Sequence, residues 1–555
     1  MVRATFSGFN TALSALQANQ KRLDITGQNL SNMNTAGYTR QQLEASSLNY
    51  TNPVSHYSNG NETAVGFGVS MDRVSQIRDP YLDIQYRSQS ADCSYTNRLQ
   101  TALNSLSKVL DETTISGIRQ AFDDVQSTLT SMQDPAKVSD PIYESELRTK
   151  MQSVCNLFNQ ASRQITQAEQ NEFQRLTGEG SSEQGDVQKI NDILRQIGDL
   201  NVQIKRNQVA GHPSLELQDE RNLLLDELSG YIPVETRYYK DDAHSGNNAY
   251  DYDANGAVIG KKDWPDDLEV SMNYIDAQGK SQKLILVNGS DLGADGLTKN
   301  YGQLSMLKGD HQITASVSDP TNISIKFEKA PSYQVNGQAA TDVYAELKGI
   351  HFEGGSLQAS LDMLQKKGTG NVINGSVDDV RGYQYYSEKL DQLADTFAKS
   401  MNASNNGNNH KDQNLLSNST DDSTTGITAG NIGISKGWTS GTIHISTDGT
   451  NRTDTILDMI AAMKDTKKLN GKTFADYMNN LSTQLASDSS SNQTALKTGT
   501  TVLNSIQDSR DSLSGVSLDE EATNMMAYVS AYNAASRLMT ALDEVLNTLI
   551  SNTGA

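Results

Sequence analysis

Residues 515–550 read GVSLDEEATNMMAYVSAYNAASRLMTALDEVLNTLI, and apolar side chains recur along this stretch every seven residues. The repeating positions are Leu518, Met525, Tyr532, Met539 and Leu546. Smaller apolar companions stand four residues after the first two of these and three residues after the later ones: Ala522, Val529, Ala535, Leu542 and Leu549. Neither Pro nor Gly interrupts residues 517–553. A strict seven-residue repeat favours a left-handed supercoil, so the stretch predicts a long C-terminal helix that packs against a partner helix.

The N-terminal end of the chain supplies a matching pattern. An apolar row recurs there at the same interval: Phe9, Leu16, Leu23 and Leu30, with Phe6 and Leu13 on the same face. Gln20 and Gly27 interrupt the companion row, which makes this half of the seam the weaker one. Residues 29–40 are rich in Asn and Gly, which tolerate the left-handed conformation that ends helices. We expect residues 1–40 and 515–555 to form one paired helical rod domain, a coiled coil of the two chain ends.

Both ends also resemble a known family. Leu23-Asp24, Gln28-Asn29-Leu30-Ser31-Asn32 and Asn34-Thr35-x-Gly37-Tyr38-x-Arg40 resemble the N-terminal motif shared by bacterial flagellar rod, hook and hook-associated proteins. Residues 515–522 and Tyr528-x-x-Ala531-Tyr532-x-Ala534-Ala535 are similar to the C-terminal pattern of the flagellar hook-associated protein 1 family, the hook–filament junction proteins. The resemblance covers about 35 residues at each end.

This resemblance implies a structural, self-assembling adaptor that joins hook to filament. The implied partners are a ring of identical subunits, hook protein on one side, a second junction protein or the filament on the other, and an export chaperone. The implied location is the extracellular flagellum, reached through the flagellar export channel without a cleaved signal peptide. The expected assembly interface follows the two seams: Phe9, Leu13, Leu16, Leu23, Leu30, Leu518, Met525, Val529, Tyr532, Met539, Leu542 and Leu546.

The middle of the chain predicts a mainly α fold with an inserted β region. Apolar stripes at helical spacing predict long helices between residues 79 and 228, and Asp79-Pro80 and Asp140-Pro141 are typical helix starts. Residues 41–75 suggest a linker in which Gly66-Phe67-Gly68-Val69 starts a short extended piece, residues 404–426 a polar loop, and Ile432 to Ile445 a small hairpin. We expect residues 41–235 and 350–514 to form an elongated helical bundle. Short β runs between turns predict a β-rich outer domain at residues 236–349.

Composition and motifs argue against several other functions. The net charge is −21, which disfavours nucleic acid and anionic membranes as partners. The seven histidines are scattered, no nucleophile elbow or Walker loop is present, and Cys93 and Cys155 lack a metal-site spacing. Asp251 to Gly256 matches half of a calcium loop, but Lys262 stands where a bidentate carboxylate is needed, so an Asx-rich turn is the preferred interpretation. We therefore expect no cofactor, no metal and no enzyme activity.

Three alternatives stay open from the sequence. A hook or distal-rod protein would share the terminal motifs, but such proteins usually have a mostly β middle, which the helices at residues 79–228 oppose. A secreted hydrolase would need a catalytic constellation, and a surface adhesin would use the β region.

The sequence also predicts that the terminal helices are poorly ordered in the isolated chain and become ordered on assembly. Isolated helices are marginal in water, and these seams include Gln20, Gly27 and Ser536. Ordering the backbone costs roughly 1–2 kcal/mol per residue, which neighbouring subunits would offset. Hydrogen exchange should find weak amide protection at residues 16–30 and 525–546 in the monomer and strong protection in flagella. Strong protection in the monomer would contradict this prediction.

Overall fold

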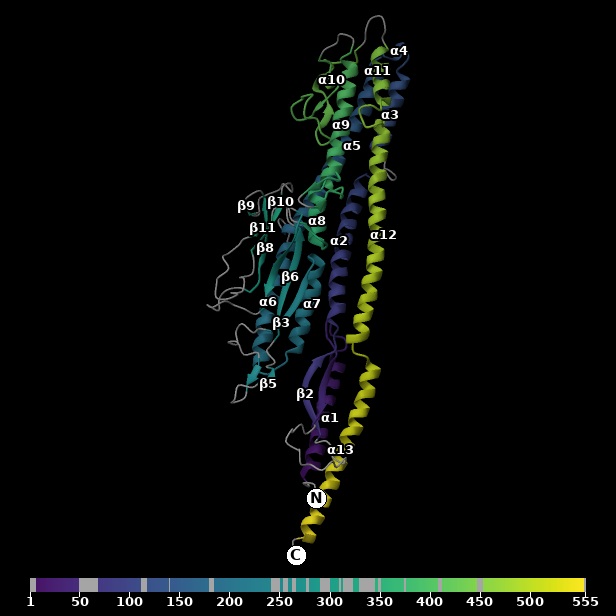
Figure 1. Ribbon diagram of the computed structural model, residues 1–555. Coiled ribbons are helices and arrows are strands. Elements are labelled where there is room, and N and C mark those ends of the chain that lie inside the picture. The colour runs from purple at the N-terminus through teal and green to yellow at the C-terminus, as the bar shows by residue number, and fades with distance from the viewer. Residues whose placement is uncertain are drawn as a thin grey trace.

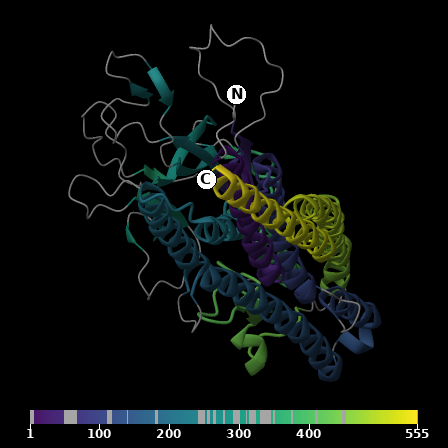
Figure 2. The ribbon, with the colours of Figure 1, turned by 90° about the horizontal axis from the view of Figure 1, so that it is seen from below.

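The computed structural model describes residues 6–48, 68–110, 117–138, 140–178, 184–240, 250–252, 258–261, 266–275, 279–289, 300–308, 311–312, 323–328, 345–347, 351–373, 376–407, 412–446 and 453–553. The molecule is long and narrow, with both chain ends at the same end of it (Figure 1). It is mainly helical with small sheets, so the predicted fold class is confirmed. Viewed along the long axis, the strands of the β region lie on one side and α12 and α13 on the other (Figure 2).

The two terminal helices lie side by side, as predicted. They are α1 (Phe6–Asn32) and α13 (Leu518–Thr553), and we call this pair the rod. The linker prediction for residues 41–75 is wrong at its start, where β1 (Gln41–Ser47) forms an antiparallel pair with β2 (Val69–Gln76), whereas β2 agrees with the extended piece expected to start at residues 66–69. This pair packs on α1, and Ser14 Oγ accepts a hydrogen bond from the Val69 amide at 3.2 Å. The sequence concealed it because its strands are polar and their pairing joins segments about 30 residues apart.

The helices predicted for the first half of the bundle are present. They are α2 (Pro80–Leu110), α3 (Ile118–Ser131), α5 (Pro141–Thr177), α6 (Asp186–Val209) and α7 (Leu215–Tyr231), with a short α4 (Pro135–Val138). The predicted starts of α2 and α5 are confirmed. Asp79 Oδ1 accepts from the Tyr81 amide and Asp140 Oδ1 from the Ile142 amide, both at 2.9 Å, and a Pro follows each Asp. An acceptor side chain and a fixed proline φ together satisfy the first helical turn.

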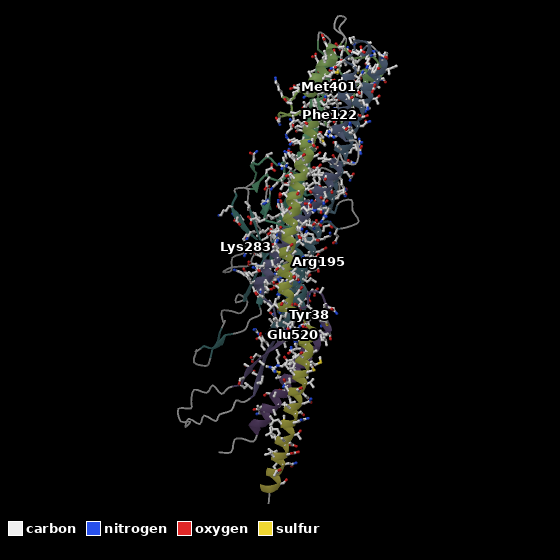
Figure 3. The ribbon with its side chains drawn as sticks, turned by 90° about the vertical axis from the view of Figure 1, so that its right-hand side faces the viewer. Tyr38, Phe122, Arg195, Lys283, Met401 and Glu520 are labelled. Atoms are coloured by element: carbon white, nitrogen blue, oxygen red, sulfur yellow. The ribbon has the colours of Figure 1, made fainter. Side chains whose placement is uncertain are left out.

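The second half of the bundle follows the β region in the sequence. Its helices are α8 (Ser356–Gln365), α9 (Tyr383–Asn405), α10 (Lys436–Ser440), α11 (Asp454–Lys464) and α12 (Phe474–Ser514). Four aromatic rings join α3, α5, α9 and α12 at the upper end of the bundle. Phe122 lies 5.9, 5.2 and 5.5 Å, between ring centroids, from Phe158, Phe397 and Phe474 (Figure 3).

The predicted hairpin between Ile432 and Ile445 is wrong in its pairing. β16 (Ile432–Ile434) pairs with β15 (Leu416–Asn418), which lies inside the residues expected to be a loop. The segment after β16 is the short α10, capped by Ser435, whose Oγ accepts from the Trp438 amide at 3.2 Å. The side chain of Trp438 is fully buried, which favours this helical turn over a second strand. A further pair joins β13 (Val372–Ile373) and β14 (Ser376–Val377).

The β region begins directly after α7. Its strands are β3 (Glu235–Lys240), β4 (Tyr250–Tyr252), β5 (Val258–Lys261), β6 (Asp266–Ile275), β7 (Ser281–Asn288), β8 (Gln303–Lys308), β9 (His311–Gln312), β10 (Ile323–Glu328), β11 (Ala345–Leu347) and β12 (His351–Phe352). All pairings among them are antiparallel, in the orders β12-β6-β3 with β7 also on β6, β11-β10-β8-β9, and β4-β5. The short β runs expected at residues 268–272, 284–287, 323–327 and 343–347 are confirmed as strands over their described residues; residues 343 and 344 lie outside the described residues.

The calcium-loop candidate lies in the β region. Asp251 is in β4, which pairs antiparallel with β5, so the flanking structure is strand and strand instead of helix and helix. Residues 253–257 lie outside the described residues. In the described part of the chain, no group of His, Cys, Asp or Glu side chains could hold a metal ion.

The sheet of β6 and β7 packs directly on α6. Asn201 of α6 is buried, and its Nδ2 donates to the Leu268 and Gly289 carbonyls at 3.1 and 3.0 Å. Its Oδ1 accepts from Arg221 Nη1 of α7 at 2.8 Å. A buried amide with three partners fixes the orientation of the sheet against α6 and α7.

Replacing this amide should loosen the contact between sheet and bundle. Asn201→Ala leaves two strand carbonyls and a buried guanidinium with fewer partners, at a cost of about 2–4 kcal/mol in the free energy of unfolding. Gln203→Ala on the exposed face of the same helix is the matched control and should change it little. Denaturant unfolding of both full-length variants tests this. Equal stabilities would show that the amide does not hold the sheet.

Candidate functional site

Three contacts define how α1 and α13 pair. A Cβ placed on Gly8 would lie 3.3 Å from Leu542 Cδ2, the guanidinium of Arg22 lies 5.6 Å from the Tyr528 ring centroid, and Asn29 Nδ2 lies 3.4 Å from Glu521 Oε2. From the first contact to the second, the position changes by 14 residues on each helix, and from the second to the third by 7. Residue numbers rise along α1 while they fall along α13. The pair is therefore an antiparallel coiled coil with one register.

On α13 the structure changes one row of the predicted seam. The row at Met525, Met539 and Leu546 is partly buried, as is Leu542 of the companion row. Tyr532 is 36% exposed, whereas Leu518 and Val529 are 51% and 43% exposed. The companion row that faces α1 runs through Glu521, Tyr528, Ala535 and Leu542, seven residues apart. Polar residue types at its first two positions concealed it, and the prediction selected Ala522 and Val529 instead.

On α1 the predicted leucine row lies at the margin of the contact. Phe9, Leu16, Leu23 and Leu30 are partly buried and Leu13 is 46% exposed. The buried positions are mostly small or polar: Ala12, Ala18, Asn19, Ile25, Thr26 and Asn29. Small side chains let the α13 backbone and the β1–β2 pair approach α1 closely, so the leucines remain partly accessible from outside the chain.

Asn29 is the centre of a polar cluster at the upper end of the rod. Its side chain is 1% exposed. Its Nδ2 donates to the Gln41 carbonyl at 3.0 Å, and its Oδ1 accepts from the Gln41 amide at 3.0 Å and from the Tyr38 hydroxyl at 2.9 Å. These bonds fix the turn between α1 and β1. Burial, followed by the charges of Asp219, Glu216 and Glu521, raises the pKa of Tyr38 to about 12, so its hydroxyl stays protonated and donates.

Arg40 joins this cluster to both C-terminal helices. Its Nε donates to Glu521 Oε1 at 2.8 Å and its Nη1 to Glu520 Oε2 at 2.7 Å, and its backbone amide donates to the Ser514 carbonyl at 2.9 Å. Ser514 ends α12 and Glu520 and Glu521 begin α13, so one residue holds both sides of the break at residues 515–517. We call this region, residues 29–41 with 514–521, the joint (Figure 3, Tyr38 and Glu520).

Next to the joint, a second set of ion pairs holds the end of α12 on α2 and α7. Arg510 of α12 bonds Asp83 of α2 at 3.1 Å and Asp226 of α7 at 2.7 Å, and its guanidinium lies 4.2 Å from the Tyr86 ring centroid. Arg87 also bonds Asp226 at 2.8 Å. These arginines are 13% and 3% exposed, and charged hydrogen bonds with so little solvent are stronger than surface pairs.

A cleft of about 700 Å³ opens between the joint and the bundle. Its lining combines the apolar side chains of Met33 and Leu223 with the guanidinium groups of Arg40, Arg78 and Arg510. Each of these guanidinium groups already bonds a carboxylate.

Sequence reasoning missed the residues that build the joint. Asn29, Tyr38 and Arg40 belonged to the resemblance motif, and Glu521 was available as an acidic residue of the first helical turn. Nothing local indicated that Glu521 faces Asn29 and Arg40. No pattern singled out Arg510 or Asp226, because their partners lie on other helices.

Among the described residues, no helix is long and apolar enough to cross a membrane.

Three family models match the chain. The flagellar hook-associated protein FlgK helical domain matches residues 103–415, the flagella basal body rod protein matches residues 9–39, and the C-terminal region of the flagellar basal body rod FlgEFG proteins matches residues 509–552.

Individual flagellar proteins, two relatives and one solved structure among them, are also similar to the chain. The flagellar hook-associated protein 1 of Bacillus subtilis (strain 168) is 29% identical over 568 residues, covering 99% of both chains. The protein of the same name from Salmonella typhimurium is 29% identical over 230 residues, covering 41% of this chain and 38% of that protein. The solved structure of the flagellar hook junction protein FlgK from Burkholderia pseudomallei shares 17% identity at a TM-score of 0.35, covering 60% of this chain and 44% of that one.

Asp219 should make the stability of the joint depend on pH. Its Oδ2 accepts from the Thr39 amide at 3.1 Å, yet burial raises its pKa to about 6. Because the folded pKa lies above the unfolded value, the stabilisation is complete below about pH 4 and is lost as pH rises through about 6. The wild-type chain should therefore lose about 3 kcal/mol relative to Asp219→Asn between pH 4 and pH 7. Unfolding curves of both proteins at several pH values measure this, and a constant difference would contradict the prediction.

Proposed function

The chain belongs to the family of flagellar hook-associated protein FlgK, and from this membership we propose that it is a structural component of the bacterial flagellum, a self-assembling adaptor that joins hook to filament. The observation that carries the proposal is the FlgK helical-domain match over residues 103–415, more than half of the chain. The rod-protein models match only the terminal segments. A hook or distal-rod protein would account for the terminal matches but not for the bundle, and it is therefore the weaker alternative.

The accessible apolar side chains of the rod support a role in assembly. On α13, Leu518, Met526, Val529, Leu538, Val545 and Ile550 are between 43% and 65% exposed. Large apolar side chains that stay exposed in such number along one helix are typical of surfaces that contact other subunits.

The twelve expected interface residues form three sets of four, according to their exposure and their position on the two helices. Met525, Met539, Leu542 and Leu546 are partly buried and lie on the α13 rows that face α1, so we assign them to pairing within the chain. Leu13, Leu518, Val529 and Tyr532 are at least 36% exposed, and we assign them to contacts with neighbouring subunits. Phe9, Leu16, Leu23 and Leu30, at the margin of the pair, would contribute to both. With this assignment, no residue has to be fully buried within the chain and also contact a neighbouring subunit.

The remaining features of the proposal follow from the family. The partners would be identical subunits in a ring, hook protein on one side, a second junction protein or the filament on the other, and an export chaperone before assembly. A place in the axial structure of the extracellular flagellum follows from family membership. Passage through the flagellar export channel without a cleaved signal peptide completes the proposal.

A strain that lacks the chromosomal copy tests the role. We expect hooks without filaments, and restored filaments when the wild-type gene is returned. Val529→Lys should fail to restore them, because it places a charge on the exposed apolar face while lysine keeps a high helix propensity. Gln493→Lys, on the exposed side of α12, is the matched control and should restore them. Electron microscopy scores hooks and filaments, and missing hooks would point to a hook or rod protein.

We also propose that the chain has no catalytic activity, in keeping with its structural family. The charged side chains of the joint are paired with one another, as Arg40 is with Glu521, and such pairs hold segments of the chain together. Purified protein should leave peptidoglycan and casein uncut. Turnover that persists through repurification would contradict this expectation.

A further inference from the structure

The rows through which α1 and α13 meet do not by themselves select a register. On α13 they run through Met525, Tyr532, Met539 and Leu546 and through Tyr528, Ala535 and Leu542, all at intervals of seven. The facing row of α1 contains Gly8, Ala15, Arg22 and Asn29, also at intervals of seven. A shift of α13 by one heptad would again bring small or apolar side chains together over most of the length. Repetitive seams of this kind commonly need a polar pair to fix their register.

Glu521 is the member of the α13 row that breaks this repetition. It is 2% exposed, although Asp519 and Glu520 beside it are exposed. Its carboxylate accepts from Arg40 Nε at 2.8 Å and from Asn29 Nδ2 at 3.4 Å. A one-heptad shift would withdraw this carboxylate from Arg40 and leave the buried Asn29 amide opposite Tyr528 or beyond the start of α13. Losing a charged, buried hydrogen-bond acceptor is costly, whereas the apolar contacts change little.

The covalent link between α12 and α13 does not replace this polar selection. The link consists of residues 515–517. Unwinding the adjacent end of α12 would lengthen it enough to allow α13 to shift. The buried side chains of α12 all lie between Phe474 and Leu485. Beyond them α12 contacts α2 through polar and small groups, such as Gln100 on Ser489 at 2.7 Å and Gly499 beside Cys93. Unwinding the last turn of α12 therefore exposes no large buried apolar surface.

We propose that Glu521, with Asn29 and Arg40 as its partners, is the positioning residue that selects the register of α13 against α1. Because Arg40 also holds the end of α12, the same contact would set where the rod begins relative to the bundle. The inference deepens the proposed function, since subunits that pack in a ring must present their rods in one register.

Cysteine pairs read the register directly in the full chain. Ala535→Cys is combined with Ala15→Cys, which faces it in the register described, or with Gly8→Cys or Arg22→Cys, which face it after a shift of one heptad in either direction. The natural cysteines Cys93 and Cys155 are buried, and each single-cysteine variant gives the background. Cross-links are formed by mild oxidation both in purified protein, where they trap the paired population, and in flagella.

The wild-type background should give the 15–535 cross-link almost alone. Adding Glu521→Leu should raise the ratio of shifted to unshifted cross-links by roughly tenfold, the effect of losing one buried polar contact. Glu521→Gln retains an acceptor and should restore most of the original pattern. Glu544→Leu, an exposed acid on the same helix, is the matched control and should change nothing.

Two results would overturn the proposal. An unchanged pattern in Glu521→Leu would show that the seam or the link selects the register without the carboxylate. Loss of all three cross-links would show that the cluster holds the helices together without choosing among registers. If the wild-type chain does not enter flagella, the proposed function fails instead, and the cross-links in purified protein still decide the register.

Discussion

The buried contact of Arg40 with Glu521 is the interaction on which the arrangement of the molecule depends. It ties the turn after α1 to the first turn of α13, while the Arg40 amide holds the last carbonyl of α12. Three segments, two of them distant in sequence from the third, therefore meet at one residue, through its guanidinium and its backbone amide. Arginine suits this role because its charge is permanent and its planar group can bond two carboxylates at once. Removing either partner would leave a charge in a region with little solvent.

Packing changes in character along the molecule. At the upper end, phenylalanines from four helices form a dense core, in which Phe122 and Phe397 are fully buried. Along the lower part of α12 the contacts become polar or small, and on α13 the only buried apolar side chain among those described is Ala535. The bundle thus stabilises itself, whereas the rod keeps apolar surface accessible. This division agrees with a subunit whose bundle folds alone and whose rod is completed by neighbouring subunits.

The β region is bound to the bundle by specific polar contacts as well as apolar ones. Asn201, Asn191 and Asn300 connect α6 to the sheets, for example through Asn191 Nδ2 on the Leu304 carbonyl at 2.8 Å and Asn300 Nδ2 on the Gly198 carbonyl at 3.0 Å. Side-chain amides suit these contacts because they can donate to a backbone carbonyl on either the helix or the sheet side. The sheets therefore have a defined orientation on the helices, although they are inserted between α7 and α8 in the bundle's sequence.

The sequence by itself determined the features that depend on neighbours within a few turns of chain. The seven-residue repeats predicted both terminal helices, the Asp-Pro pairs at residues 79–80 and 140–141 predicted two helix starts, and short β runs between turns predicted the main strands. Contacts between distant segments needed the tertiary structure. Glu521 resembled an ordinary acidic residue of a first turn, and β1 and β15, the true partner of β16, lay in polar stretches without a strong pattern. A seven-residue repeat specifies which face of a helix is buried but is unchanged by a shift of seven residues, so the register of the rod was decided only when folding brought Asn29 and Arg40 to Glu521.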